Sequence, residues 1–234
     1  MHKILVVARK ETRELMRTKS TMLVGLGFAF FYSLLNSLAV IKGKDSASAI
    51  SLDGSVFYLS AMVGMFIAYM STGQVFLREK TDRVIETLMC APVNLRQIWL
   101  GKVLGVTAVA YSLSFFTALV IMVVANILLK SIVLPGAPIL FHVLLVIPTS
   151  IAAFAGLLGF VQLRLGLRES RILNFVIFAP LFAGLYGVGR MVGSSFAISW
   201  IQVGILFAIS VFLLAVTAYL TKRLSKERIV TTIN

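Results

Sequence analysis

Long apolar stretches without internal charge constrain this chain more than any other feature. Hydrophobic residues make up 59% of the 234 residues, against about 45–50% in soluble domains. Each stretch is close to the roughly 20 residues that cross the hydrocarbon core of a bilayer as a helix. We therefore predict an all-α integral membrane protein with six spans, at about Thr21–Ile41, Val56–Leu77, Val103–Leu129, Ile139–Leu163, Ile172–Gly189 and Ser195–Tyr219.

Positive charges gather on one side of this six-span arrangement. Of the 22 Lys and Arg residues, only Lys42, Lys44, Lys130 and Arg190 fall on the other side. Loops rich in Lys and Arg stay in the cytoplasm. This predicts a multi-pass plasma-membrane protein with both termini cytoplasmic. The net charge of +13 lies between apolar spans, so it does not indicate a nucleic-acid partner.

Residues 3–19 have the pattern of an amphipathic helix. At 100° per residue, one side is largely apolar and the other is basic; the two sides are Ile4, Leu5, Ala8, Thr12, Leu15 and Met16, and Lys3, Arg9, Lys10, Arg13 and Arg17. Such a helix lies in the headgroup layer and is attracted to anionic lipid. The alternative is a basic leader that only sets the orientation of the spans. Both interpretations are compatible.

The connection between the second and third spans, residues 78–102, is the longest charged segment of the chain. Its first part predicts a short helix, which Pro92 ends. Asn94 and Gln97 then form the pattern of a capping box ahead of a new helix. A solvated loop is the simple interpretation. A docking helix is the other, and its candidate contact residues are Arg78, Glu79, Asp82, Arg83, Glu86, Leu88 and Met89.

Uncharged polar residues and small residues are the other candidates within the spans. The polar ones are Asn36, Gln74, Asn126, Gln162, Asn174 and Gln202. They either bond between helices or line a substrate route, for which the candidates are Asn36, Gln74, Asn126 and Asn174. Ala179, Ala183 and Gly187 recur every four residues. They indicate close helix packing, either within the chain or at a dimer seam.

Motifs for nucleotide, metal or covalent chemistry are missing. Gly101-Lys102 lacks the upstream glycine and the following Ser or Thr of a phosphate-binding loop. The two histidines, His2 and His142, are too far apart to suggest a metal site, and Cys90 is the single cysteine. A channel or secondary carrier would need ionisable groups at membrane depth, and a membrane enzyme would need a catalytic cluster. Neither feature is visible in the sequence.

The chain resembles permease subunits of the type-2 ABC transporter family, which share the type V exporter fold. The resemblance covers the whole length in architecture. Its motifs are Phe76-Leu77-Arg78-Glu79-Lys80, Ile85-Glu86-Thr87-Leu88, Ala91-Pro92 and Gly101-Lys102. The family often has Gly-Thr where Val84-Ile85 stand here. The resemblance implies one membrane domain over residues 1–234, with an interfacial helix at 3–19, a coupling segment at 78–102 and a cytoplasmic tail at 222–234.

The resemblance also implies partners and mechanism. Similar permeases pair as two six-span halves, either identical or different, and dock two separate ATPase subunits. ATP and Mg would be bound by those subunits, so no cofactor is expected in this chain. The segment at 78–102 resembles the helix through which ATPase closure switches the export route.

Overall fold

The structure is a computed structural model, which describes residues 2–19, 22–27, 29–31, 34, 48–77, 94–130, 134–165, 169, 172, 175–179, 183 and 198–221. The regular structure in these ranges is helical. Its elements are α1 (His2–Arg17), α3 (Ser48–Thr72), the π-helical segment η1 (Gly73–Leu77), α6 (Leu95–Leu129), α7 (Ala137–Phe141), the π-helical segment η2 (His142–Val146), α8 (Ile147–Arg164) and α10 (Trp200–Leu220).

Four of these helical stretches are long and apolar enough to cross a membrane. They are Leu52–Leu77, Leu95–Ile127, Ala137–Arg164 and Trp200–Leu220. They confirm the predicted second, third, fourth and sixth spans. The predicted first and fifth spans fall mostly outside the described residues. From the first, an apolar helical stretch at Met22–Phe31 is described in part, and Gly25 there lies against Leu113 of α6 and Ile67 of α3.

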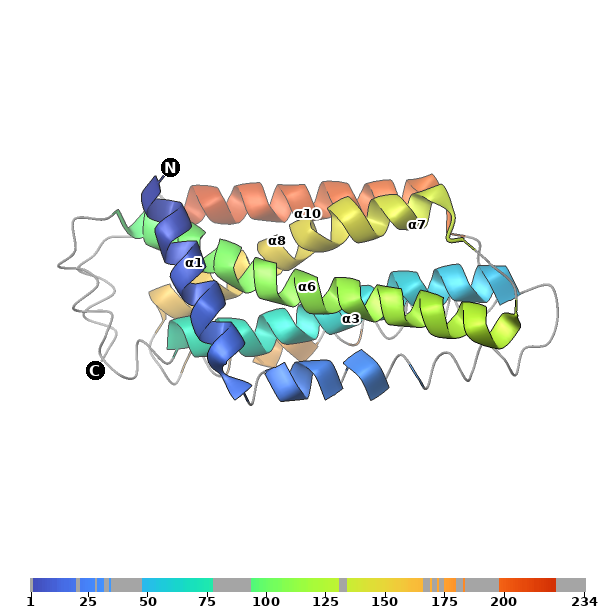
Figure 1. The fold of residues 1–234 in the computed structure, drawn as a ribbon. Helices are drawn as coiled ribbons and strands as arrows, with labels where there is room; N and C mark the ends of the chain where they lie inside the picture. Colours follow the sequence, from blue (N-terminus) through green and yellow to red (C-terminus); the bar gives the residue numbers. More distant parts are fainter. Residues whose placement is uncertain are drawn as a thin grey trace.

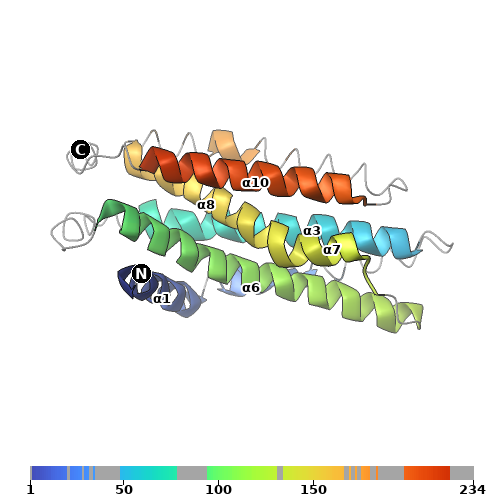
Figure 2. The same ribbon diagram turned by 90° about the horizontal axis from the view of Figure 1, so that it is seen from above.

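The long helices run side by side, with α3, α6 and α8 in mutual contact and α10 packed on α8 (Figures 1 and 2). Small residues allow this close approach. A Cβ atom on Gly64 of α3 would lie 2.7 Å from Cδ1 of Ile151 and 3.1 Å from Cβ of Ser114. Because lipid tails are as apolar as leucine, helices in a bilayer associate through such tight contacts rather than through the hydrophobic effect.

Pro148 lies in the first turn of α8, directly after the π-helical segment η2. A proline inside a helix favours a kink, because it cannot donate a backbone hydrogen bond. Immediately before it, in η2, the Ile147 N–H donates to the His142 carbonyl oxygen five residues earlier. The Thr149 hydroxyl donates to the carbonyl oxygen of Leu145 at 2.8 Å. The hydroxyl thus gives this carbonyl oxygen a side-chain donor within the turn that contains the proline.

Capping residues mark the observed starts of two helices, α6 and α10. The α6 helix begins at Leu95, and the Asn94 N–H donates to Gln97 Oε1 at 3.4 Å, which confirms the predicted restart. The α10 helix begins at Trp200 rather than at the predicted Ser195. There the Ser199 N–H donates to Gln202 Oε1 at 3.2 Å. Gln202 therefore lies inside the span, as predicted, and caps its first turn.

Candidate functional site

Helix α1 crosses the side of α6 near the end of the bundle where η1 stops and α6 begins (Figures 1 and 2). Two glycines one turn apart on α6 permit the contact. A Cβ atom on Gly101 would lie 2.7 Å from Val7 Cβ and 3.0 Å from the Ile4 carbonyl oxygen, and one on Gly105 would lie 2.7 Å from Glu11 Cβ. We call α1, η1 and residues 95–105 of α6 the base junction.

Glu11 is the charged residue that α1 buries against α6. Its relative exposure is 3%, although Arg9, Lys10, Arg13 and Glu14 around it are exposed. A buried carboxylate is strongly unfavourable unless it is paired. The burial of Glu11 therefore requires a cation inside the junction.

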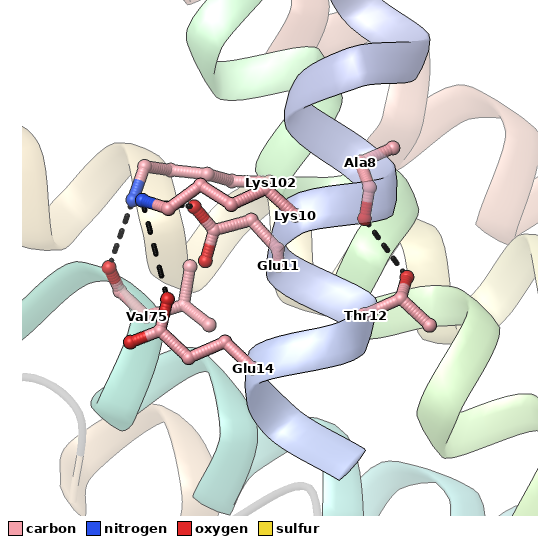
Figure 3. Close-up of polar contacts among 7 residues, drawn as sticks. All are labelled: Ala8, Lys10, Glu11, Thr12, Glu14, Val75 and Lys102. Carbon is pink, nitrogen blue, oxygen red and sulfur yellow. Dashed lines mark hydrogen bonds and ion pairs between the residues drawn. The ribbon is translucent and has the colours of Figure 1, made fainter. Parts of the chain in front are cut away.

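Lys102 of α6 supplies that cation. Its Nζ lies 3.6 Å from Glu11 Oε1 and donates to the Val75 carbonyl oxygen at 3.0 Å. Its ammonium group also lies 5.3 Å from the centroid of the Phe76 ring. Figure 3 shows the side chains of α1 and α6 converging on the backbone of η1. One ammonium group thus joins the three elements of the base junction.

A second lysine reaches the same carboxylate from the outer side. Lys10 Nζ lies 3.7 Å from Glu11 Oε1 and 4.0 Å from Glu14 Oε2 (Figure 3). The Lys10 and Glu14 side chains are more than half exposed, and exposed pairs of this kind contribute roughly 0–1 kcal/mol. The buried pair with Lys102 is different, because removing one partner would leave a charge in a desolvated site.

Contacts to α8 and α10 extend the junction into the bundle. The Trp99 indole N–H donates to the Gly156 carbonyl oxygen at 3.3 Å. A Cβ atom on Gly159 would lie 2.7 Å from the Phe76 ring, and one on Gly156 would lie 3.9 Å from Thr217 of α10. The base junction therefore contacts α8, and α8 in turn contacts α10.

The seven predicted docking residues, Arg78, Glu79, Asp82, Arg83, Glu86, Leu88 and Met89, lie outside the described residues. The flanks of their segment are described. The segment follows Leu77, the last residue of η1, and Asn94 begins the turn into α6. Leu77 and the first residues of α6, directly after Asn94, belong to the base junction.

The predicted route residues do not form one cluster. Asn36 and Asn174 lie outside the described part of the chain. Gln74 lies in η1 beside the residues that contact Lys102, and Asn126 lies close to the other end of α6. At 1.5 Å per residue, Asn126 is about 36 Å along the helix from Lys102. Both described residues are partly buried.

The predicted seam is described at two of its three positions. Ala179 is partly buried and Ala183 is exposed, whereas Gly187 is outside the described residues. Near Ala179, the Phe178 ring stacks on Tyr69 of α3 with centroids 4.2 Å apart. This places Phe178 against α3, and the dimer role stays a prediction.

Sequence reasoning missed the residues that define the base junction. Glu11 was not singled out, and Lys102 was counted as a cytoplasmic charge although it is 3% exposed. A signal for Glu11 existed, since at 100° per residue it falls on the same side of the helix as Ile4, Ala8 and Leu15. The pairing itself joins positions 91 residues apart and had no local signal.

Within the described ranges, no group of three His, Cys, Asp or Glu side chains could hold a metal ion. His142 is buried, stacks on Phe57 with ring centroids 4.1 Å apart, and its Nε2 donates to the Phe57 carbonyl oxygen at 3.2 Å. This arrangement is a packing contact between α3 and η2. The base junction likewise joins helical elements, through the Glu11–Lys102 pair and the Val75 carbonyl oxygen.

Comparison with known proteins agrees with this picture. Residues 11–180 match the model of the family described as ABC-2 family transporter protein. The match contains both Glu11 and Lys102, and the whole segment between η1 and α6. No curated protein matches the sequence. With four apolar helices that can cross a membrane and a family match over most of its length, the chain belongs to the ABC-2 transporter family and forms the membrane-spanning part of an ABC transporter.

Proposed function

We propose that this chain is the membrane subunit of an ATP-driven exporter whose ATPase is a separate polypeptide. The observation that carries the proposal is the base junction, where Lys102 connects α1, η1 and α6. The segment that resembles a coupling helix leaves from η1 and returns into α6. A force applied to that segment would act on all three elements, because tightly packed elements move as rigid bodies.

The proposal includes six spans. Two further spans, beyond the four described, are supported by the positions of the helices that come before and after each of them. Helix α1 and the start of α3 lie near opposite ends of the bundle, and so do the end of α8 and the start of α10 (Figure 1). One further crossing in each interval, at the predicted first and fifth spans, would connect these ends. The bias of Lys and Arg then places both termini and the base junction in the cytoplasm.

The proposed partners are two ABC ATPase subunits and a second permease copy. The ATPase subunits would bind ATP and Mg, and would contact the seven docking residues named above. The apolar side of the docking helix would pack either in a cleft of the ATPase or against the bases of the spans. The carboxylates of Asp82 and Glu86 would bind basic groups of the ATPase.

Pull-down of the co-expressed ATPase tests this function. Glu86→Lys should remove ATPase association, because a charge-assisted bond broken in a desolvated interface costs about 2–5 kcal/mol. The matched control is Glu169→Lys, which makes the same charge change at an exposed residue after α8. Leu88→Asp should act like Glu86→Lys. Normal association in Glu86→Lys and Leu88→Asp would reject the docking assignment and leave the fold unaffected.

A further inference from the structure

The free face of α1 combines three arginines with exposed apolar side chains. Arg9, Arg13 and Arg17 recur every four residues and are exposed. With Thr12 and Met16 they line a shallow groove of about 440 Å³. In the described part of the chain, none of these three guanidinium groups lies within ion-pair distance of a carboxylate. The groove therefore presents concentrated positive charge beside apolar surface.

The length of α6 places this groove at the depth of lipid headgroups. The helix has 35 residues, which is about 52 Å, whereas the hydrocarbon core is about 30 Å thick. Its apolar surface stays exposed as far as Ile127, which is 69% exposed. Counting back about 20 residues from Ile127 reaches Ala108. Gly101 and Gly105, where α1 crosses, then lie just outside the hydrocarbon.

The contacts of α1 also fix which of its flanks points toward the membrane centre. Gly105, the deeper of the two glycines, lies against Glu11, Ala8 and Thr12, whereas Gly101 lies against Ile4 and Val7. Around the helix, the contacts of Gly105 are shifted toward Thr12 relative to those of Gly101. The flank that carries Thr12 is therefore the membrane-facing one. At 100° per residue, the side chains within about 40° of Thr12 on the outward side are Leu5 and Met16, which are 63% and 58% exposed.

The arginines follow on the side directed away from the bundle. From Thr12 the order around the helix is Met16, Arg9, Arg13 and Arg17. Apolar groups thus face the acyl chains, and guanidinium groups stand beside them at headgroup level. Arginine binds phosphate oxygens through two parallel hydrogen bonds. An ATPase that docks at the end of the bundle would approach along the span axes, not from this lateral side.

We propose that Arg9, Arg13 and Arg17 form a binding site for the phosphate of an anionic phospholipid of the cytoplasmic leaflet, with Met16 and Leu5 against its acyl chains. The proposal rests on the interfacial placement of α1 in the proposed function. It goes further than general attraction to the membrane, because it assigns the binding to one face. Since the opposite face of α1 carries Glu11 and its bond to Lys102, a lipid bound here would hold the base junction in place.

Native mass spectrometry of the purified full chain tests the site, with phosphatidylglycerol and phosphatidylcholine titrated separately. The test variant carries Arg9→Gln, Arg13→Gln and Arg17→Gln. The control carries Arg96→Gln, Lys130→Gln and Arg164→Gln, which removes the same charge from exposed residues outside α1. At about 1 kcal/mol per basic residue, the test variant should bind phosphatidylglycerol about a hundredfold more weakly. The control should stay near the wild-type affinity.

Three results would overturn the proposal. Equal losses in the test and control variants would show that only total charge matters. Unchanged binding in the test variant would exclude the site. Lost ATPase pull-down with unchanged lipid binding would show that this face contacts protein. Lipid binding and ATPase association are measured separately, so failure of the lipid site is distinguishable from failure of the proposed function.

A further variant and a thermal measurement keep the proposal testable if the glutamine variant misfolds. Replacing the three arginines by lysine keeps the charge and should retain most of the phosphatidylglycerol binding. Phosphatidylglycerol should also raise the Tm of the wild-type chain above its value in phosphatidylcholine, because a ligand that binds only the folded state stabilises it. Equal Tm values in the two lipids would contradict the proposal, even if the glutamine variant did not fold.

Discussion

Lys102 Nζ lies 3.6 Å from Glu11 Oε1, and both side chains are only 4% exposed. The two residues come from α6 and α1, and the same ammonium group donates to the Val75 carbonyl oxygen of η1. Burying a charge pair is not in itself stabilising, since desolvation can exceed the Coulomb attraction. A pair in this position does, however, fix how three helical elements are arranged. The pair therefore joins three helical elements at the base of the bundle.

The first prediction concerns the energy of this pair. Glu11→Gln and Lys102→Met should each destabilise the chain, by up to about 3–5 kcal/mol, because one partner remains buried without its counter-charge. The loss in Lys102→Met should be at the lower end, since Lys10 also lies 3.7 Å from Glu11. The double variant should lose less than the sum of the two. Thermal unfolding in detergent measures all three variants.

The control for this cycle is Glu14→Gln. The Lys10–Glu14 pair spans 4.0 Å between exposed side chains and should change stability by less than about 1 kcal/mol. Additive losses in Glu11→Gln and Lys102→Met would show that the two residues do not interact energetically.

The second prediction concerns the close contact between α1 and α6. Gly101→Ala and Gly105→Ala should each destabilise the chain by about 1–3 kcal/mol, the usual effect of overpacking. The new methyl group at position 101 would meet the Ile4 carbonyl oxygen at 3.0 Å, and backbone cannot move aside as a flexible side chain can. The matched control is Gly204→Ala in α10, where a Cβ atom meets nothing within 4 Å.

Gly204→Ala should be neutral or stabilising by about 0.5–1 kcal/mol, because alanine favours helix over glycine. Unfolding of the three alanine variants under the same conditions gives the comparison. If Gly101→Ala were as stable as Gly204→Ala, the close approach of α1 to α6 would be wrong.

The third prediction concerns orientation. Cys90, in the segment between η1 and α6, should react with a thiol reagent only when the reagent can enter the cytoplasm. In a variant without Cys90, Ser48→Cys at the start of α3 should react in intact cells with a reagent that cannot cross the membrane. The physical reason is the distribution of Lys and Arg, which retains the strongly basic side in the cytoplasm. The reverse labelling pattern would invert the proposed topology.

The fourth prediction distinguishes binding of the ATPase from transmission of its conformational change to α1. Lys102→Met should still bind the ATPase, because Lys102 is buried and is not one of the seven proposed docking residues. Trapping the wild-type complex with ATP and vanadate should change the hydrogen exchange of α1 amides, measured by mass spectrometry. This change should be absent in Lys102→Met. A full wild-type response in that variant would show that the junction transmits nothing through its ion pair.

The sequence predicts the four described spans well, because apolar length is a local property. The third and fourth spans were predicted at Val103–Leu129 and Ile139–Leu163, and the helices extend beyond them at their starts, to Leu95 and Ala137. Local capping chemistry located Leu95. The same chemistry at Ser199 and Gln202 was overlooked, so the last span was predicted to begin too early.

The base junction could be predicted only in part, because tertiary contact decides it. The amphipathic pattern placed Ile4, Ala8 and Leu15 together with Leu5 and Met16 on one apolar side. The structure divides that side: Leu15 is 3% exposed, whereas Leu5 is 63% exposed. The position of α6 decides which of these apolar side chains are buried, and the sequence of α1 alone does not predict that position. The same holds for Gly101 and Gly105, whose small size matters only because α1 crosses there.

ATP hydrolysis by proteoliposomes tests the central claim most directly, namely that a separate ATPase drives this membrane subunit. Three preparations are compared: the chain alone, the chain with its co-expressed ATPase, and the Glu86→Lys chain prepared in the same way. The account predicts background hydrolysis for the chain alone, clear hydrolysis for the complex, and a return to background for Glu86→Lys because the ATPase no longer co-purifies. Sustained hydrolysis by the chain free of other polypeptides would contradict it.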